Sequence, residues 1–294
     1  MKKYFVIIFS LLTLSLFLIR SAHAQTVAMS VHVSGNTLVD SQNSPLVLRG
    51  VNHSGTEYAC VQGWGIFDGQ TDAASVQAMK SWGINSVNIL LNEDCWLGIN
   101  GVKEEFGGLN YQQAIVSYTK LLESYGIYPV LSLHWSAPGA ELATGQSPMP
   151  DADHSIAFWQ SVATTFMGDQ AVIFRLQEEP FPANNTDTTA AWQCYRDGGN
   201  SCSESFDVVG FQSLVNNVRA AGAQNVIGLS GIRYGNSMSQ FLTYKPTDPL
   251  GNSMAMVDVY PDLNPCGTTA CYESDYAPIT KIMPFMAIHT ISIN

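Results

Sequence analysis

The sequence has few charged residues and contains no run of basic ones. Acidic residues outnumber basic residues by 24 to 13, which gives a formal net charge of −11. An acidic surface does not attract nucleic acid or anionic membranes, so we expect neither as a partner. A low charge content together with many glycine, serine, threonine, asparagine and aromatic residues suits a secreted protein that handles neutral, hydroxyl-rich ligands.

The sequence also lacks the short motifs that mark nucleotide and zinc sites. No Gly-x-Gly-x-x-Gly or P-loop pattern follows a predicted strand, so nucleotide binding has no support and we expect no cofactor. No Cys-x-x-Cys pair is present, which disfavours a zinc ion bound by cysteines.

The six cysteines all lie beyond residue 24 and are an even number, which favours disulfides formed in an oxidising compartment. The sequence alone allows fifteen connectivities. Two pairs are close in sequence within turn-rich segments, and the third pair is what remains. The favoured pairs are therefore Cys194/Cys202, Cys266/Cys271 and Cys60/Cys95.

Only one long hydrophobic run is present, and it lies at the N-terminus. Lys2 and Lys3 precede the apolar residues 4–19, and Ala22-His23-Ala24 fits a small-x-small cleavage site. We interpret residues 1–24 as a signal peptide, with a retained N-terminal anchor as the alternative. The sequence therefore predicts a secreted, extracellular protein, monomeric and without a membrane contact after cleavage, whose single catalytic domain spans residues 25–294.

Strand-like and helix-like segments alternate along the mature chain after a short hairpin. This alternation predicts a parallel sheet, and the regular spacing favours a closed (β/α)8 TIM barrel over an open sheet. The expected strands are residues 46–52, 84–91, 127–133, 172–177, 226–229, 253–259 and 285–288. The expected helices are residues 72–82, 110–125, 154–166, 206–221 and 277–282. An eighth strand and its helices have no counterpart, so we expect a barrel that lacks the last strand and helices.

Six of the expected strands end on polar or titratable residues. In the clearest case an apolar run from Val172 leads into Glu178, Glu179 and Pro180. Barrel enzymes keep their chemistry at the carboxyl ends of the strands, so these ends predict one cleft built from many strands.

Several segments together resemble secreted cellulases of glycoside hydrolase family 5. They are Leu48-Arg49-Gly50-Val51-Asn52, Leu91-Asn92-Glu93-Asp94-Cys95-Trp96, Leu133-His134-Trp135, Glu179-Pro180, Tyr244-Lys245-Pro246-Thr247-Asp248-Pro249 and Val259-Tyr260. The resemblance covers effectively the whole mature chain. It implies a (β/α)8 barrel, a β-1,4-glucan oligosaccharide or polysaccharide as substrate, and retaining hydrolysis by two glutamates as an endoglucanase.

The sequence departs from the family pattern at positions near the scissile bond. Glu179 holds the slot of the acid/base, while Glu178 replaces the asparagine that holds the sugar 2-hydroxyl. Asn88 stands in place of an arginine on the second strand. By the same resemblance, His134 and Trp135 are expected to bind substrate.

Two further departures affect the far side of the expected cleft. Asp258 replaces the histidine of a His-x-Tyr pattern whose tyrosine, Tyr260, is kept, and both positions are expected to contact substrate. His289 occupies the slot of the nucleophilic glutamate. Retaining hydrolysis needs two carboxyl groups about 5 Å apart, so we expect activity that is weak or lost.

Other functions remain open at this point. The protein could be a non-catalytic glucan-binding pseudoenzyme, or Asp258 could act as the base of an inverting hydrolase. A metalloprotein is a further alternative, because two imidazoles and two carboxylates would meet at the strand ends. Its candidate ligands are His134, Glu179, Asp258 and His289.

Overall fold

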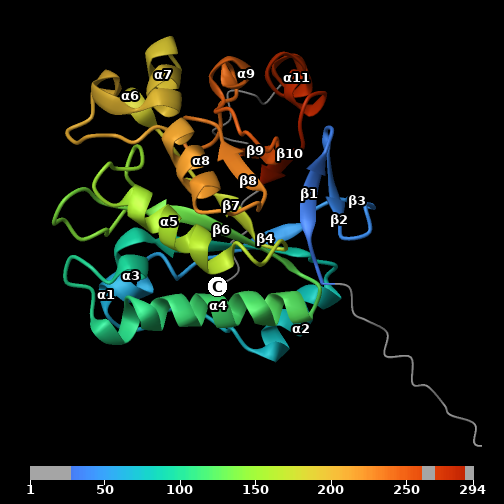
Figure 1. Cartoon of the computed structure of the whole chain (residues 1–294), viewed down its shortest axis with the longest axis vertical. Helices are drawn as coiled ribbons and strands as arrows, with labels where there is room; N and C mark the ends of the chain where they lie inside the picture. The colour runs from blue at the N-terminus through green and yellow to red at the C-terminus, as the bar shows by residue number, and fades with distance from the viewer. Residues whose placement is uncertain (1–27, 260–268, 289–294) are drawn as a thin grey trace, which may run out of the picture.

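A computed structural model describes residues 28–259 and 269–288, and for residues 200, 201 and 288 only the backbone. Seven parallel strands form one curled sheet in the order β10-β9-β8-β7-β6-β5-β4 (Figure 1). The strands are β4 (Gly50–His53), β5 (Ser86–Asn92), β6 (Tyr128–Trp135), β7 (Ile173–Arg175), β8 (Ile227–Ser230), β9 (Ser253–Asp258) and β10 (Phe285–Ile288). The order follows the chain, as expected for successive βα units, and confirms the predicted barrel fold, of which the described residues supply seven strands.

A small antiparallel sheet precedes the barrel strands. It consists of β1 (Val31–Ser34), β2 (Thr37–Asp40) and β3 (Pro45–Leu46). Its backbone meets the loops before β7 and β9, where the Val31 N–H donates to the Gln170 carbonyl and the Val33 N–H donates to Asn252 Oδ1. The hairpin therefore covers the amino ends of the barrel strands.

The helices lie mainly on the outer side of the sheet, as Figure 1 shows for α2, α4, α5 and α8. They are α1 (Ala59–Gln62), α2 (Ala73–Ser81), α3 (Glu93–Leu97), α4 (Leu109–Ser124), α5 (Ser155–Phe166), α6 (Pro182–Asn185), α7 (Thr189–Asp197), α8 (Phe211–Ala220), α9 (Phe241–Tyr244), α10 (Thr269–Cys271) and α11 (Ala277–Thr280). Three further helical segments are not α-helical: the 3-10 helices η1 (Glu104–Phe106) and η2 (Gly199–Cys202), and the π-helix η3 (Tyr272–Tyr276).

Apolar side chains form two separate clusters, one on each side of the barrel strands. The larger cluster packs the helices onto the outside of the sheet; α4, for example, buries Ile115, Tyr118 and Leu122 at helical spacing. The smaller cluster fills the barrel near the amino ends of the strands. We call its inward residues Val130, Ile173, Met254 and Met256 the apolar layer; Val31 and Leu38 of the hairpin pack against it.

Most predicted elements are confirmed within a few residues, and the differences have local causes. The first barrel strand begins at Gly50 rather than at residue 46, because Leu46 pairs with Leu38 in the hairpin sheet. The helix predicted over residues 206–221 begins only at Phe211. Helices α3, α6 and α7 lie in segments that periodicity did not mark as helical.

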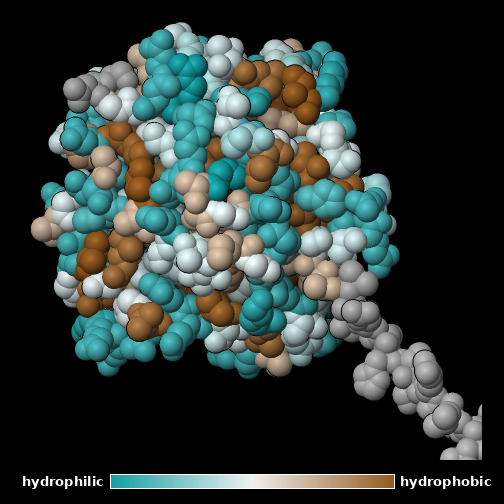
Figure 2. All heavy atoms as spheres, in the orientation of Figure 1, coloured by the Kyte–Doolittle hydropathy of each residue, from teal (hydrophilic) through white to brown (hydrophobic). Residues whose placement is uncertain are grey.

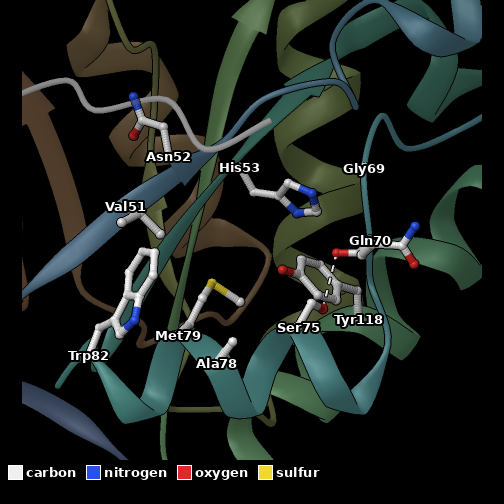
Figure 3. A pocket seen from close by; sticks show the side chains of 10 residues that line it. All are labelled: Val51, Asn52, His53, Gly69, Gln70, Ser75, Ala78, Met79, Trp82 and Tyr118. Carbon is white, nitrogen blue, oxygen red and sulfur yellow. Dashed lines mark hydrogen bonds between the residues drawn. The ribbon is translucent and has the colours of Figure 1, made fainter.

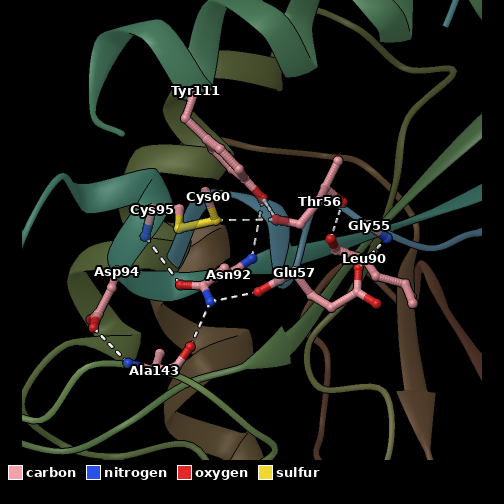
Figure 4. Close-up of a disulfide and its surroundings, with 10 residues drawn as sticks. All are labelled: Gly55, Thr56, Glu57, Cys60, Leu90, Asn92, Asp94, Cys95, Tyr111 and Ala143. Carbon is pink, nitrogen blue, oxygen red and sulfur yellow. Dashed lines mark hydrogen bonds between the residues drawn. A yellow bond between two sulfur atoms is a disulfide. The ribbon is translucent and has the colours of Figure 1, made fainter. Parts of the chain in front are cut away.

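Two of the three predicted disulfides are confirmed. Cys60–Cys95 joins α1, which follows β4, to α3, which follows β5 (Figure 4), and Cys194–Cys202 links α7 to η2. The third predicted pair includes Cys266, which lies outside the described residues. Residues 1–24 lie outside them too, so the signal peptide stays a prediction.

The face drawn in Figure 2 is mostly hydrophilic, with hydrophobic residues in small separated patches. Over the described ranges, no helix is both long enough and apolar enough to cross a membrane.

Candidate active site

Polar side chains line the inside of the barrel above the apolar layer. The Asn88 amide on β5 donates to Asn52 on β4 and to Glu178 beyond β7, both at 3.0 Å. Ser132 on β6 donates in turn to the side-chain Oδ1 of Asn88. Hydrogen bonds therefore connect strands that are far apart in the sequence. Asn88 itself is buried, and its predicted contact with substrate stays a prediction.

Arg175, at the end of β7, is the fully buried centre of this polar layer. Its guanidinium donates to Glu178 Oε1 at 3.1 Å, to the Glu178 carbonyl at 2.7 Å, and to Asp258 Oδ2. Its Nε donates to Ser230 at 2.8 Å. A buried guanidinium needs such partners for its charge. Arg175 thus brings a positive charge to the strand ends, where Asn88 replaces the arginine expected from the family pattern.

Glu178 is held on both carboxylate oxygens. Oε1 accepts from Asn88 and Arg175, and Oε2 lies 3.0 Å from Nδ1 of His134. Burial opposes its charge, but His134, Arg175 and the Asn88 hydrogen bond outweigh burial and lower the pKa of Glu178. Strand β7 ends at Arg175, before both glutamates. The side chains of Glu178 and Glu179 are therefore not forced to opposite faces, as neighbouring side chains within a strand are.

His134, at the end of β6, lies between the two glutamates. Nδ1 faces Glu178, and Nε2 lies 3.3 Å from the amide nitrogen of Gln146. Burial favours the neutral ring, but the carboxylates of Glu178, Glu57 and Glu179 outweigh it and raise the pKa of His134. Burial raises the pKa of Glu57, whose Oε2 accepts from the Gly55 N–H. The positive charge of the protonated His134 ring is therefore favoured by several nearby carboxylates.

Glu179 reaches farther toward solvent than Glu178 and is only partly buried. Its Oε2 accepts from the Gln146 side chain at 2.5 Å. Gln146 lies in the long loop between β6 and α5, which therefore positions the side chain in the predicted acid/base slot.

Asp258, the last residue of β9, is almost fully buried and ion-paired with Arg175. Gly235 covers it so closely that a Cβ atom there would collide with the Asp258 carboxylate. Burial, opposed by Arg175 but supported by Glu178 and Glu179, raises the pKa of Asp258 to about 7. The ion pair with Arg175 and the close packing of Gly235 keep the Asp258 carboxylate away from a water molecule that it would have to activate as the base of an inverting hydrolase. We refer below to His134, Arg175, Glu178, Glu179 and Asp258 as the strand-end site.

Three aromatic rings form a row beside the strand-end site. Tyr58, in the loop after β4, has ring centroid distances of 6.1 Å to Trp64 and 6.2 Å to Trp135. Trp64 is half exposed, and Trp135 directly follows His134. The row therefore leads from the exposed Trp64 to Trp135, the last residue of β6.

Hydrogen bonds and a disulfide hold the loop that carries Tyr58, as Figure 4 shows for the residues around it. The Asn92 amide donates to the carbonyls of Glu57 and Ala143, and the Tyr111 hydroxyl donates to the Thr56 carbonyl. These buried bonds, together with the Cys60–Cys95 disulfide, fix the backbone that carries Tyr58.

Two pockets border β4, and neither contains the strand-end site. One, of about 430 Å³, lies between β4, α2 and Tyr118 of α4, with Met79 and Trp82 at its wall (Figure 3). The other, of about 290 Å³, lies between β4 and β10 and reaches Asn52 and Asn88 from below. The side chains of the strand-end site belong to the carboxyl ends of β6, β7 and β9 or follow them directly, at the end of the sheet where barrels keep their chemistry.

Comparison with known families decides what this scaffold is. The sequence model of "Cellulase (glycosyl hydrolase family 5)" matches residues 39–284. The chain belongs to glycosyl hydrolase family 5. This confirms the family expected from the sequence motifs.

Relatives within and near family 5 are distant in sequence. A mannan endo-1,4-beta-mannosidase of Salipaludibacillus agaradhaerens is 21% identical over 234 residues, which cover 78% of this chain. The chain spans only 61% of that relative's length. A beta-glucanase of Saccharophagus degradans has a TM-score of 0.65 at 16% identity, covering 90% of this chain and 74% of that one. An endocellulase of Pyrococcus horikoshii has a TM-score of 0.63 at 17% identity, covering 88% and 80%. These likenesses show the barrel fold.

Two residues predicted for the family 5 site, Tyr260 and His289, lie outside the described residues. The metal hypothesis included His289 as well. Among the residues that the structure describes, no group of three histidine, cysteine, aspartate or glutamate side chains could hold a metal ion. Asp258, another proposed ligand, has Arg175 as its partner. The described geometry therefore gives the metal hypothesis no support.

Sequence patterns missed Arg175, Glu57 and Gln146. Arg175 carried a signal, since a charged residue inside an otherwise apolar strand must find a buried partner. Glu57 and Gln146 carried none, because they lie in irregular loops whose path depends on the packed barrel.

Proposed function

We propose that this protein is a β-1,4-glucan-binding member of family 5 whose hydrolytic turnover is weak or lost. The proposal includes a mannan-type chain as substrate, because the distant relative with the matching sequence is a mannosidase. A solved family neighbour is a beta-glucanase in complex with cellotetraose, which supports a glucan. The ligand class is a neutral β-1,4-linked hexose chain of several units, handled outside the cell by a monomer.

The observation that carries this proposal is the aromatic row Trp64, Tyr58 and Trp135, which ends next to His134 of the strand-end site. Aromatic faces provide large apolar contact surfaces, and sugar rings offer apolar faces of C–H groups. A row of rings suits a linear oligosaccharide better than a compact ligand. The small share of charged residues in the chain, 13%, agrees with an uncharged ligand.

The reason to expect weak turnover is the state of the other carboxylates. Glu178 and Asp258 are both ion-paired with Arg175, and both are buried. A nucleophile or a general base must reach the sugar or a water molecule. In the sequence, the family's nucleophile position is His289, and a histidine cannot form the glycosyl ester of the retaining mechanism.

Two measurements on the purified mature protein test the proposal. Retention on insoluble cellulose and mannan, with the Trp64→Ala and Trp135→Ala variants as controls, measures binding. Release of reducing sugar from carboxymethyl cellulose and from soluble mannan measures turnover. We expect retention that both variants weaken, together with little sugar release. Ordinary cellulase turnover would contradict the loss of activity, and absence of retention would contradict the binding function.

A further inference from the structure

One side-chain amide contacts two members of the strand-end site at once. The amide nitrogen of Gln146 lies 2.5 Å from Glu179 Oε2 and 3.3 Å from Nε2 of His134. Glu179 follows β7 and His134 lies near the end of β6, so one NH2 group faces a carboxylate and an imidazole from different strands. An amide NH2 group donates two hydrogen bonds and accepts none, so both of its neighbours have to be acceptors.

This contact determines which nitrogen of the His134 ring carries the proton. A neutral imidazole has one N–H and one bare nitrogen, and only the bare nitrogen accepts a hydrogen bond. Because Nε2 faces the Gln146 donor, the proton of the neutral ring belongs on Nδ1, which lies 3.0 Å from Glu178 Oε2. The arrangement in the structure is therefore the one that suits a neutral His134.

The carboxylates around His134 favour the other protonation state. Glu178, Glu57 and Glu179 all face the ring from outside β6, and together they outweigh burial and raise the pKa of His134. Once the ring is protonated, Nε2 also carries a hydrogen and needs an acceptor. The NH2 group of Gln146 cannot accept that hydrogen, so two donors would face each other across 3.3 Å.

The Gln146 side chain can remove this conflict by turning its amide. The last torsion of a glutamine has a broad, roughly two-fold preference, so a half turn exchanges the nitrogen and the oxygen with little change in shape. The neighbouring backbone stays in place, because the Gln177 side chain donates to the Ser147 carbonyl at 2.8 Å. The turned amide offers its oxygen to the Nε2–H of His134 and no longer donates to Glu179.

We propose that Gln146 is a positioning residue that holds Glu179 only while His134 is neutral, and that protonation of His134 turns the amide and ends this hold. The side chain in the predicted acid/base slot is then fixed at high pH and released at low pH by a residue that lies outside the strands. This inference goes beyond the proposed function, because it concerns the free protein and needs no sugar.

Heteronuclear NMR of the mature protein tests the inference without a ligand. The ring nitrogens of His134 give the midpoint of its titration and show which of them is protonated. Above the midpoint we expect a bare Nε2 and a proton on Nδ1. We expect the side-chain amide signals of Gln146 to shift with the same midpoint as the ring. The Gln177 amide is the control, since it bonds to the Ser147 carbonyl instead, and its signals should not follow the titration.

A variant separates the role of the amide from the direct effect of the charge on His134. Gln146→Met keeps the length of the side chain and removes both the donor and the acceptor. In the parent protein, the carboxyl carbon signal of Glu179 should shift at the His134 midpoint, and most of this shift should be lost in Gln146→Met. His134 should still titrate in the variant, because the three carboxylates around it remain.

Four results would each overturn the inference. A neutral His134 with its proton on Nε2 would exclude the donation from Gln146, and a Gln146 amide that does not follow the titration would exclude the turn. Equal shifts of the Gln146 and Gln177 amides would mean that the surroundings respond as a whole. A full Glu179 shift in Gln146→Met would show that charge alone acts. None of these results bears on glucan binding, which the retention measurements on cellulose and mannan test separately.

Discussion

The two ends of the barrel interior are stabilised in different ways, one by apolar packing and the other by hydrogen bonds and ion pairs. Near the amino ends of the strands, the apolar layer is closed by the hairpin and contains only hydrocarbon and thioether side chains. Toward the carboxyl ends, the barrel strands carry Asn52, Asn88, Arg175 and Asp258, which hydrogen bonds and ion pairs connect through Glu178. The first arrangement stabilises by burial and tolerates modest changes in shape. The second depends on every partner being present, because an unpaired buried charge is costly.

The largest difference in stability between the two ends is expected from a substitution of Arg175. Arg175→Leu leaves Glu178 and Asp258 buried without their shared cation, and we expect a loss of about 3–5 kcal/mol in the free energy of unfolding. Urea denaturation at pH 7 measures it. A triple variant that adds Glu178→Gln and Asp258→Asn should recover part of the loss, since the uncompensated charges are then gone. A loss below about 1 kcal/mol in the single variant would show that Arg175 is not the charge partner described here.

In the apolar layer, the matched change is Ile173→Ala, two residues before Arg175 on the same strand. Ile173 is fully buried, so we expect a loss of about 2–4 kcal/mol from the smaller side chain and the cavity that remains. The effect should be confined to stability. Unchanged affinity for cellohexaose in the folded variant checks that the apolar layer supports the strand-end site without taking part in it.

The pH dependence of the free energy of unfolding also distinguishes the two ends of the barrel interior, because only the polar end contains titratable side chains. The pKa of His134 is raised in the folded protein, so its charged form stabilises the fold fully below the unfolded pKa of about 6.5. That stability is lost as pH rises through the folded pKa, because the ring then gives up the proton that the carboxylates around it favour. Unfolding free energies measured between about pH 5 and pH 9 should show this fall in the parent protein. The fall should be smaller in His134→Gln, because Asp258, whose pKa is raised to about 7, still contributes a fall below that pH. An identical pH profile in the two proteins would contradict the role of His134.

The smallest expected effect is at Ser132, at the boundary between the two ends. Ser132→Ala removes one hydrogen bond to Asn88, for which we expect a loss of about 1 kcal/mol. Chemical denaturation checks the value, and Ser161→Ala, on the outer helix α5, serves as the comparison outside the barrel. A loss as large as that of Ile173→Ala would mean that the polar network is more tightly coupled than its pairwise contacts indicate.

Much of the scaffold could be predicted because it depends on local chemistry. Buried strands such as β5 and β8 are rich in apolar residues, and α4 repeats its apolar residues at helical spacing, so each pattern identifies its element. Strand ends that carry Glu178 and Asp258 predicted where the chemistry lies. The disulfides Cys60–Cys95 and Cys194–Cys202 followed from pairing cysteines that are near in sequence and assigning the remainder.

By itself, the sequence determined the alternating strands and helices and the end of the barrel that carries titratable groups. Only the tertiary structure decided that Arg175 holds Glu178 and Asp258 together and that Gln146 contacts Glu179. The physical reason is range. Periodicity and turn chemistry act over a few residues, whereas a buried charge is paired by residues that only the packing of the barrel brings near.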